Sequence, residues 1–496
     1  MNASQSAGAL HPANEALTRN ERIVFNLYTI SALLVFVLMM LLGLTMRMAQ
    51  SNWAGVLPNV FYQIMTAHGA GMVGTIGLAT SAVMWFFLRK YVKLSLSIFL
   101  ANYVLFMLGA VALLAAVFIG GYAGAWTFLY PLPQHPMGLW SGNAAALFML
   151  GYLLIGVGFL LFYLDVMRAI IRMYSNLGRA LGLQWLFSGD IDKSHPKTVV
   201  ASTMVAITNS IGILAGAIVL VMCLINIYFP SVALNALLVK NLTYLFGHMF
   251  INASIYMGVI AVYELLPRYS GRPYPISRPF LWSWAASLVM VLIVYPHHLM
   301  MDYVMPHWML VMGQIISYCA GLPVFTVTVF GALANIYRSG MRWNMPSRLL
   351  VLSMFGWAAG IVPAIIDGTI SVNKLMHNTQ WVPGHFHFYL LLGVLPMVLA
   401  LMFHVIGQNA PSRSSDKLSF PLYILGGLIF VFSFLAAGHI STPRRYAVHL
   451  PQWLLYDQFG SIGAILLIVA MLVFALHIVV GLLRSPGNGD SAHATG

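Results

Sequence analysis

The chain has 496 residues, of which 60% are hydrophobic and only 7% are charged, and its formal net charge is +13. A mean hydropathy of +0.86 excludes a soluble domain, because a water-soluble fold of this length could not bury so much apolar surface. The two cysteines, Cys223 and Cys319, lie in apolar segments, which excludes a disulfide framework and a CxxCH haem attachment. We therefore expect an all-α polytopic membrane protein.

Twelve apolar windows of about 20 residues follow one another along the chain, and each is long enough to cross a bilayer as a helix. We expect a single transmembrane domain over 24–484, with polar tails at 1–23 and 485–496. The predicted spans are 24–48, 61–88, 97–120, 144–168, 200–228, 239–267, 282–303, 307–337, 348–372, 380–407, 418–438 and 461–484.

The basic residues fall almost wholly in alternate connections between these spans, as Arg89, Lys90 and Arg168 illustrate. Such asymmetry marks the cytoplasmic face, so it predicts that both termini are cytoplasmic and that the membrane is a bacterial-type inner membrane. The positive charge is therefore a signature of membrane orientation, and no nucleic-acid partner is expected. Arg444 and Arg445 are the exception, because they lie in an outer connection and need an explanation of their own.

Six histidines fall at one depth in the outer part of the predicted membrane. A lone histidine in a span is more often a hydrogen-bonded core residue than a ligand. Six at one depth on four helices make that interpretation poor, because polar groups in lipid are costly and mark cofactor or ion sites. The six are His68, His248, His297, His298, His385 and His387.

Local spacing divides these histidines among different metals. His385 and His387 are two residues apart, about 200° around a helix, so they point to opposite sides. The adjacent pair at 297–298 follows Pro296, and a bend there would let both rings converge on one ion. His248 from the preceding span would complete a three-histidine metal site with an open position for a small substrate.

Five sequence stretches carry a resemblance to a known family. They are FYQIMTAHG around His68, the dipeptide GH at 247–248, the histidine pair HH at 297–298, HNTQWVPGHFH at 377–387 and STPRRYAV at 441–448. With the order of the spans, they resemble the catalytic subunit, subunit I, of the haem-copper oxidase superfamily, and most closely its B type. The resemblance covers all twelve spans and implies a twelve-transmembrane-helix bundle.

The resemblance also implies two haems, of b or a-derived type, and one copper of the CuB type. His68 and His387 would be the axial ligands of a low-spin haem, and His385 the proximal ligand of a high-spin haem. His248, His297 and His298 would hold the copper. The outer arginines, Arg444 and Arg445, would then pair with haem propionates, and Asp302 and His377 match positions near those propionates.

One position departs from the family pattern. Oxygen-reducing members that this sequence resembles carry a tyrosine four residues after the first copper histidine, and here that residue is Asn252. Residues i and i+4 share a helix face, so the amide should project into the same pocket as the imidazole of His248. Asn252 is therefore a candidate catalytic residue.

The asparagine bears on the choice of substrate. Cleaving O2 takes four electrons, one of which the phenol supplies together with a proton. Joining two NO molecules to N2O and water takes two electrons and two protons, and nitric-oxide-reducing members of the superfamily lack the tyrosine. The sequence therefore favours NO reduction, with O2 reduction by a cytochrome c oxidase as the alternative. A rescuing phenol at Tyr256 or Tyr295 stays open.

Two further features bear on the metal and on the proton supply. Reductases of this superfamily with iron at the second site place a glutamate near it, whereas the nearest one here, Glu264, lies four helical turns from His248, so copper is favoured.

Tyr263 matches a member of the B-type proton track from the cytoplasm. Valines replace polar members of that track at 259, 324 and 327, and only the threonines at 326 and 328 could compensate, so we expect a weakened inner route.

Since this chain has no site for CuA or covalent haem c, the resemblance implies a subunit II-like partner that carries one of them and receives electrons from a c-type cytochrome or cupredoxin. Two rival classes remain open. A twelve-span transporter would need internal pseudo-symmetry and charges at mid-membrane. A metal-storage or assembly protein would leave the pairing of His68 with His387 without purpose.

Overall fold

The computed structural model describes residues 16–127, 136–187, 189–302, 304–407 and 414–484. Most of both predicted tails lies outside these residues. The long regular elements of the described chain are all helices, and its only β-type pairing is an isolated bridge between Thr379 and Pro443. Helices are the expected solution in lipid, where each backbone N–H and C=O must be satisfied within its own segment. The all-α prediction is confirmed.

Within the described residues, twelve helical segments are long and apolar enough to cross a membrane, and they match the twelve predicted spans in order. The first six spans are unbroken helices, accompanied by the short helix α5 (Leu177–Ala180). They are α1 (Arg19–Gln50), α2 (Pro58–Leu88), α3 (Leu96–Phe118), α4 (Gly142–Tyr174), α6 (Lys197–Tyr228) and α7 (Ala236–Ser270).

Three of the later spans are interrupted. The seventh and eighth are each built from two pieces, and the tenth contains a π-helical turn between two α-helices. The helical elements that follow α7 are, in chain order, α8 (Arg278–Ile293), η3 (Tyr295–Leu299), α9 (His307–Ala320), α10 (Leu322–Ile336), α11 (Met345–Asp367), α12 (Ile370–Met376), α13 (Trp381–His387), η4 (Phe388–Val394), α14 (Leu395–Ile406), α15 (Ser414–His439) and α16 (Leu454–Arg484).

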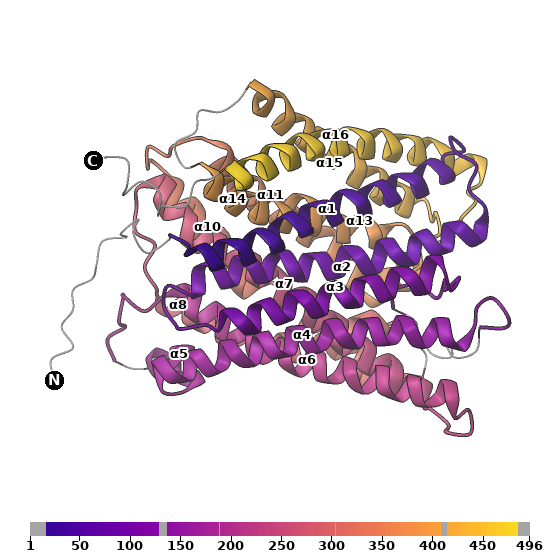
Figure 1. Cartoon of the computed structure of the whole chain (residues 1–496), viewed down its shortest axis with the longest axis horizontal. Coiled ribbons are helices and arrows are strands. Elements are labelled where there is room, and N and C mark those ends of the chain that lie inside the picture. Colours follow the sequence, from indigo (N-terminus) through magenta and orange to yellow (C-terminus); the bar gives the residue numbers. More distant parts are fainter. Residues whose placement is uncertain (1–15, 128–135, 188, 303, 408–413, 485–496) are drawn as a thin grey trace.

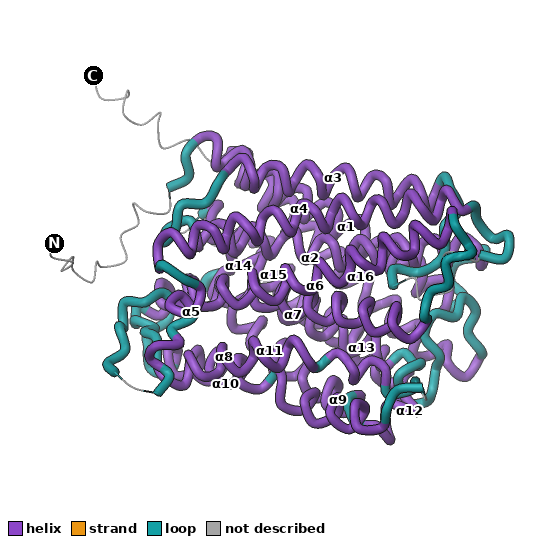
Figure 2. Tube along the Cα trace, turned by 90° about the horizontal axis from the view of Figure 1, so that it is seen from below, coloured by secondary structure: helices purple, strands orange, loops and turns teal. Residues whose placement is uncertain are grey.

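The long helices run side by side along the long axis of the molecule, with the loops gathered at the two ends (Figures 1 and 2). The bundle closes on itself because the first helix, α1, packs against the last, α16, as well as against α2. Helix α7 contacts both α2 and the short η3 segment. These packings bring distant parts of the sequence, residues 58–88, 236–270 and 295–299, to the centre of the molecule.

One end of the bundle carries the predicted basic clusters, and we call it the basic end. There a guanidinium nitrogen of Arg89 lies 3.7 Å from a carboxylate oxygen of Glu21. The side chain of Arg278 donates to the backbone carbonyl of Trp185, and that of Arg342 donates to the backbone carbonyl of Arg268. The opposite end, which holds the connection at 440–450, we call the histidine end because all six predicted ligands lie in its half of the bundle. The basic clusters therefore share one end, as predicted, while its cytoplasmic side stays a prediction.

Helix ends differ from the prediction mainly in the last span. A short 3-10 turn at Pro451–Trp453 and then α16 extend it ten residues further than the predicted start at 461. The charge of Asp457 lowers the local hydropathy, yet its side chain is fully buried and ion-paired with Arg47. A hydropathy window cannot recognise a charge that a distant residue neutralises.

Candidate redox-metal site

All six histidines line a single cavity of about 570 Å³ in the interior of the bundle. The wall is mostly apolar, with contributions from several helices, and Asn252, Asp367, His377, Arg444 and Arg445 also border it. A large apolar cavity with a few convergent polar groups is the usual form of a small-molecule or cofactor site. The structure thus brings together histidines that are up to 319 positions apart in sequence, from His68 to His387.

His68 and His387 face each other across this cavity. Their ring centres are 6.3 Å apart and the ring planes differ by 24°. If one iron were bound by a nitrogen of each ring, each bond would be about 2 Å long. Adding the distance from nitrogen to ring centre on both sides gives a separation between ring centres of this size. The pair therefore fits a six-coordinate haem iron.

Both rings of this pair are held by backbone carbonyls. Nδ1 of His68 lies 2.7 Å from the carbonyl oxygen of Met39, and Nδ1 of His387 lies 2.6 Å from that of Pro383. A carbonyl oxygen only accepts, so each Nδ1 must carry the proton and donate it. Each Nε2 is left unprotonated, the form in which imidazole binds a metal.

A glycine makes room for the first of these rings. A Cβ at Gly43 in α1 would lie 2.8 Å from Cε1 of His68, closer than van der Waals contact allows. The absence of a side chain lets α1 and α2 approach until the carbonyl of Met39 reaches the imidazole. Helix–helix packing, rather than local sequence, fixes this ring.

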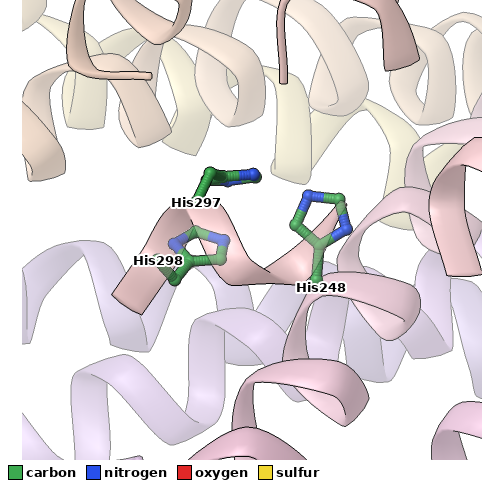
Figure 3. A group of neighbouring side chains, drawn as sticks. All are labelled: His248, His297 and His298. Atoms are coloured by element: carbon green, nitrogen blue, oxygen red, sulfur yellow. The ribbon is translucent and has the colours of Figure 1, made fainter. Parts of the chain in front are cut away.

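His248, His297 and His298 form a second cluster, shown in Figure 3, in which the ligand nitrogens all lie within 4.8 Å of one another. His248 projects from α7, and the other two come from η3, where Pro296 replaces an α-helical turn with a 3-10 turn. The ring centres of His297 and His298 are 4.1 Å apart. Three imidazoles bound to one ion would have their ligand nitrogens about 3.4 Å apart, so small movements of the rings would bring the three nitrogens to one metal ion.

The close packing of α9 supports the bent segment. A Cβ at Gly313 would lie 3.0 Å from the backbone nitrogen of His297, so a side chain there would push α9 and η3 apart by a few tenths of an ångström. Nδ1 of His297 is buried and has no hydrogen-bond partner among the described residues. An orphaned ring nitrogen in an apolar interior is costly, and a bound metal ion would satisfy the three-histidine cluster.

His385 lines the same cavity from α13, two residues before His387. Its Nδ1 is also buried without a partner among the described residues, and its ring meets the ring of Tyr389 edge-on at 5.7 Å. Directly after the two histidines, the chain makes a π-helical turn, η4, which sequence reasoning missed. Such turns in α-helices often mark functional sites.

Asn252 lies one turn from His248 on α7, as the i, i+4 spacing predicts. Its amide nitrogen is 2.9 Å from Nδ1 of His248 and donates to the backbone carbonyl of the same residue at 2.9 Å. The two predicted alternatives for a rescuing phenol are placed differently. Tyr256 borders the cavity, whereas the hydroxyl of Tyr295 donates to Asn241 at 3.1 Å and does not face it.

A tyrosine that sequence reasoning missed touches the three-histidine cluster. The ring of Tyr244 stacks on that of His298, with centres 5.4 Å apart and planes 16° apart. Tyr244 precedes His248 by four residues, so it occupies the same face of α7 as Asn252, on the other side of the histidine. The i−4 spacing could have identified it.

The two outer arginines border the histidine end of the cavity. The backbone N–H of Arg444 donates to the carbonyl of Asn378 at 2.9 Å, which ties the connection at 440–450 to the segment before α13. Burial lowers the pKa of Arg444 to about 10, and repulsion from Arg445 acts in the same direction. Arg445 has a positive φ of 67°, a strained conformation for a non-glycine residue and one often found at functional sites.

Of the two weaker propionate candidates, the structure places only His377 at the cavity. Its Nδ1 is 3.2 Å from the amide nitrogen of Asn373 and 3.9 Å from a carboxylate oxygen of Asp367, which sequence reasoning missed. Asp302 instead pairs with Lys240 at 2.9 Å, and it is not among the residues that line the cavity in the described chain. Its predicted role has no geometric support.

At the basic end, the hydroxyl of Tyr263 is 2.5 Å from Oγ1 of the buried Thr328. Thr326 is exposed, so only one of the two compensating threonines faces the interior. Glu264 is far from the histidines, with its carboxylate held by Lys90 at 3.1 Å, by Tyr91 at 2.9 Å and by Thr198. The described three-histidine cluster contains no carboxylate.

The twelve-helix bundle and its buried, histidine-lined cavity define a class of polytopic helical membrane protein with an internal cofactor-sized site. The sequence pattern of the family described as "Cytochrome C and Quinol oxidase polypeptide I" matches residues 23–483, nearly the whole chain. The chain therefore belongs to this family, within the haem-copper oxidase superfamily.

Individual relatives are distant in sequence. "Cytochrome c oxidase polypeptide 1" of Halobacterium salinarum is 22% identical over 463 residues, which cover 89% of this chain and 74% of the relative. "Cytochrome c oxidase subunit 1" of Thermostichus vulcanus is 21% identical over 394 residues, covering 76% and 67%. "Heme-copper oxidase subunit I+III" of Aeropyrum pernix is 23% identical over 264 residues, covering 52% of this chain and 32% of the relative, so the match spans about a third of that longer protein.

A solved structure shows the same fold. The chain aligns with a haem-copper terminal oxidase from a dimer determined by cryo-EM, with a TM-score of 0.78 and 19% identity. The alignment covers 95% of this chain and 85% of the other. The predicted architecture, a haem-copper oxidase subunit I bundle, is confirmed.

Proposed function

We propose that this chain is the catalytic subunit of a membrane haem-copper reductase with the reaction 2 NO + 2 e⁻ + 2 H⁺ → N2O + H2O. The observation that carries the proposal is Asn252, whose amide lies 2.9 Å from the ring of His248 where the family resemblance places a tyrosine. An amide can supply neither the electron nor the proton that a phenol gives to O2 cleavage. The two-electron coupling of NO needs no such group.

The proposed cofactors are two haems and one copper, which when bound supply electron transfer and the binding of the diatomic gas. His68 and His387 hold the low-spin haem, a role supported by their 6.3 Å separation and by their fixed tautomers. His385 holds the high-spin haem. The second metal is copper, bound by His248, His297 and His298, because imidazole suits copper and no carboxylate joins the described cluster.

Other residues around the cavity orient these groups. Asn252 positions the imidazole of His248. Arg444, Arg445 and His377 neutralise the haem propionates through charge-assisted hydrogen bonds, and Asp367 orients His377. Asp302 makes no contribution in this scheme.

Electrons enter at the histidine end, and the proton route from the basic end is weakened. The proposed electron donor is a c-type cytochrome or cupredoxin acting through a subunit II-like partner with CuA or haem c at the histidine end, outside a bacterial-type inner membrane with both chain ends in the cytoplasm. The contact between Tyr263 and Thr328 is the start of an inner proton route, but Val259 and Val324 are both buried and apolar further along it. With protons that instead arrive from the histidine end, as the electrons do, we expect turnover to generate little membrane potential.

Reduction of O2 to water is the second candidate, and two observations favour it. Several relatives carry the name cytochrome c oxidase. Tyr244 stacks on His298, so a phenol touches the metal cluster from a position other than the one that Asn252 occupies.

Turnover of the purified complex with NO and with O2, at matched concentrations and with the same reductant, distinguishes the two. We expect faster consumption of NO, with one N2O formed per two NO, and no loss of NO turnover in Tyr244→Phe. An Asn252→Tyr variant should retain NO turnover, because no phenol is required there. Faster O2 consumption in the unmodified enzyme, abolished by Tyr244→Phe, would establish the oxidase instead.

A further inference from the structure

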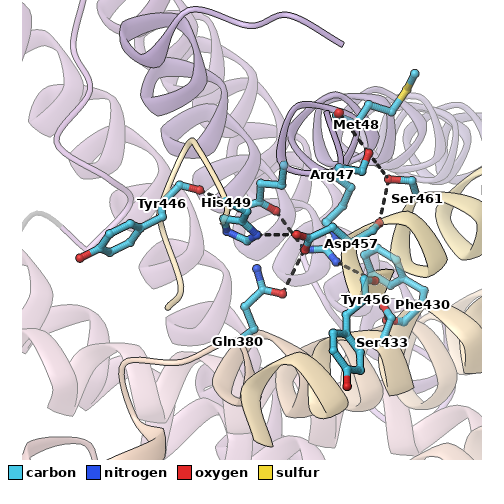
Figure 4. Close-up of polar contacts among 12 residues, drawn as sticks. Arg47, Met48, Gln380, Phe430, Ser433, Tyr446, His449, Tyr456, Asp457 and Ser461 are labelled. Atoms are coloured by element: carbon cyan, nitrogen blue, oxygen red, sulfur yellow. Dashed lines mark hydrogen bonds and ion pairs between the residues drawn. The ribbon is translucent and has the colours of Figure 1, made fainter. Parts of the chain in front are cut away.

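A buried ion pair joins the first and last helices beside the cavity. Arg47 in α1 and Asp457 in α16 approach to 3.0 Å, with side chains 3% and 0% exposed. Figure 4 shows the carboxylate of Asp457 between the guanidinium group and the ring of His449, whose Nδ1 is 2.6 Å away. The two charges come from positions 410 residues apart in sequence.

The guanidinium group is fixed from several sides. Its Nη1 donates to Oε1 of Gln50 at 2.9 Å and to Oε1 of Gln380 at 3.0 Å. A Cβ at Gly460 would lie 2.6 Å from Nη2, so the guanidinium group fits only because that residue is a glycine. Gln380 directly precedes α13, the helix that carries His385 and His387. The network therefore connects α1 and α16 to the proposed haem ligands.

Stability alone is a poor reason for this arrangement. Desolvation of two buried charges often outweighs their attraction, and replacing a buried pair with apolar side chains is frequently neutral or stabilising. A glycine, two glutamines and a histidine nevertheless surround the buried pair of Arg47 and Asp457. A functional role for the charge itself accounts for such a setting.

The charge lies next to the proposed low-spin site. The guanidinium carbon of Arg47 is 4.3 Å from the ring centre of Phe434. That ring is parallel to the ring of His387, within 7°, and 5.4 Å from it. Arg47 also lines the cavity shared by His68 and His387, and its buried Nε has no hydrogen-bond partner among the described residues.

We propose that Asp457 is a positioning residue that holds down the redox potential of the haem between His68 and His387 by neutralising Arg47. This inference rests on the proposed low-spin haem and not on the choice of NO or O2. A positive charge near the iron favours the reduced state, which carries one positive charge fewer, and low local dielectric strengthens that effect. The carboxylate offsets the charge and keeps the guanidinium group in place.

The test is a redox titration of the low-spin haem absorption band in the assembled complex. Asp457→Asn keeps the shape of the side chain but leaves Arg47 uncompensated, so the midpoint potential should rise. Arg47→Gln leaves the carboxylate uncompensated and should lower it. The double variant, which removes both charges, should return close to the unmodified value, because the two effects are coupled.

Asp416→Asn is the matched control. Asp416 is a buried carboxylate in the first turn of α15, at the opposite end of the bundle, and it contacts Nδ1 of a histidine, His477, at 3.2 Å. His477 lies about 30 Å from Asp457 along α16. The potential of the low-spin haem should not change in this variant.

The outcomes separate the inference from the function on which it rests. An unchanged potential in both single variants, with the low-spin band intact, would overturn the role of Asp457 and leave the haem assignment standing. An equal rise in Asp457→Asn and in the double variant would show that lost packing, not charge, is responsible, and would also overturn it. If Asp457→Asn does not assemble, Arg47→Gln and the double variant still decide the question. The absence of any low-spin haem in the unmodified complex would contradict the proposed function itself.

Discussion

The two histidine clusters around the cavity are built in opposite ways. His68 lies within an unbroken α-helix, His387 is the last residue of the α-helical segment before η4, and each ring is locked by a hydrogen bond to a backbone carbonyl. The three histidines at 248, 297 and 298 combine one α-helix with a bent 3-10 turn, and Nδ1 of His297 has no partner in the described chain. Preorganisation is strong at the first cluster and weaker at the second.

This difference matches two kinds of task. An electron-transfer site works best when its ligands do not move between oxidation states, because little reorganisation then accompanies each electron. A site that binds and transforms a gas needs an open coordination position and neighbours such as Asn252 that act on the substrate or on a ligand. The comparison predicts that changes at the first cluster abolish cofactor binding, whereas changes at the second alter chemistry while haem remains.

The largest effect is expected from His387→Ala. Loss of one axial ligand opens the locked pair, so the complex should retain one haem per chain instead of two and lose all turnover. Quantification of haem per chain, together with the low-spin absorption band, measures this. His404→Ala is the control, because His404 is a buried histidine of the same span whose ring contacts the hydroxyl of Tyr269, at the basic end. Both haems remaining in His387→Ala would contradict the pairing.

A smaller effect is expected when the packing behind the pair is changed. Gly43→Ala forces a methyl group against the ring of His68, and such overpacking costs about 1–3 kcal/mol. The midpoint of thermal bleaching of the low-spin band should fall. Gly74→Ala in α2 places its methyl group at an ordinary 3.4 Å from Phe106 and should leave the midpoint unchanged or higher. Equal midpoints in the two variants would show that the close approach of α1 does not matter.

The smallest effect is expected far from both clusters. Thr328→Val removes the contact with the hydroxyl of Tyr263, worth about 1 kcal/mol, and should slow turnover by at most about fivefold if protons enter from the basic end. Thr326→Val changes an exposed threonine two residues away and should have no effect. A rate unaffected by Thr328→Val would indicate that protons arrive from the histidine end.

Much of this architecture follows from sequence because lipid imposes simple rules. The twelve spans, the shared end of the basic clusters and the common depth of six histidines all follow from hydropathy and charge placement. The bend at Pro296 and the projection of Asn252 toward His248 follow from local geometry. These features depend on residues close to one another in the chain.

The features that sequence reasoning missed depend on long-range packing. The predicted last span starts too late because the charge of Asp457 lowers the local mean hydropathy, and a hydropathy average over neighbouring residues does not include its distant partner Arg47. The sequence does not show that Asp302 pairs with Lys240, and it does not reveal that Asp367 lines the cavity. The π-helical turn η4 has no hydropathy signal, since it changes the hydrogen-bond register without changing composition.

The central claim is that six histidines hold two haem irons and one copper, and metal analysis of His298→Ala tests it most directly. Iron and copper per chain are counted in the assembled unmodified complex, in His298→Ala and in His307→Ala, which alters an exposed histidine at the start of α9. We predict that His298→Ala loses one copper and keeps both haems. Its activity should fall by more than the roughly hundredfold loss that removal of an outer-shell partner of a metal ligand causes. Unchanged copper in that variant, or fewer than two haems per chain in the unmodified complex, would contradict the account.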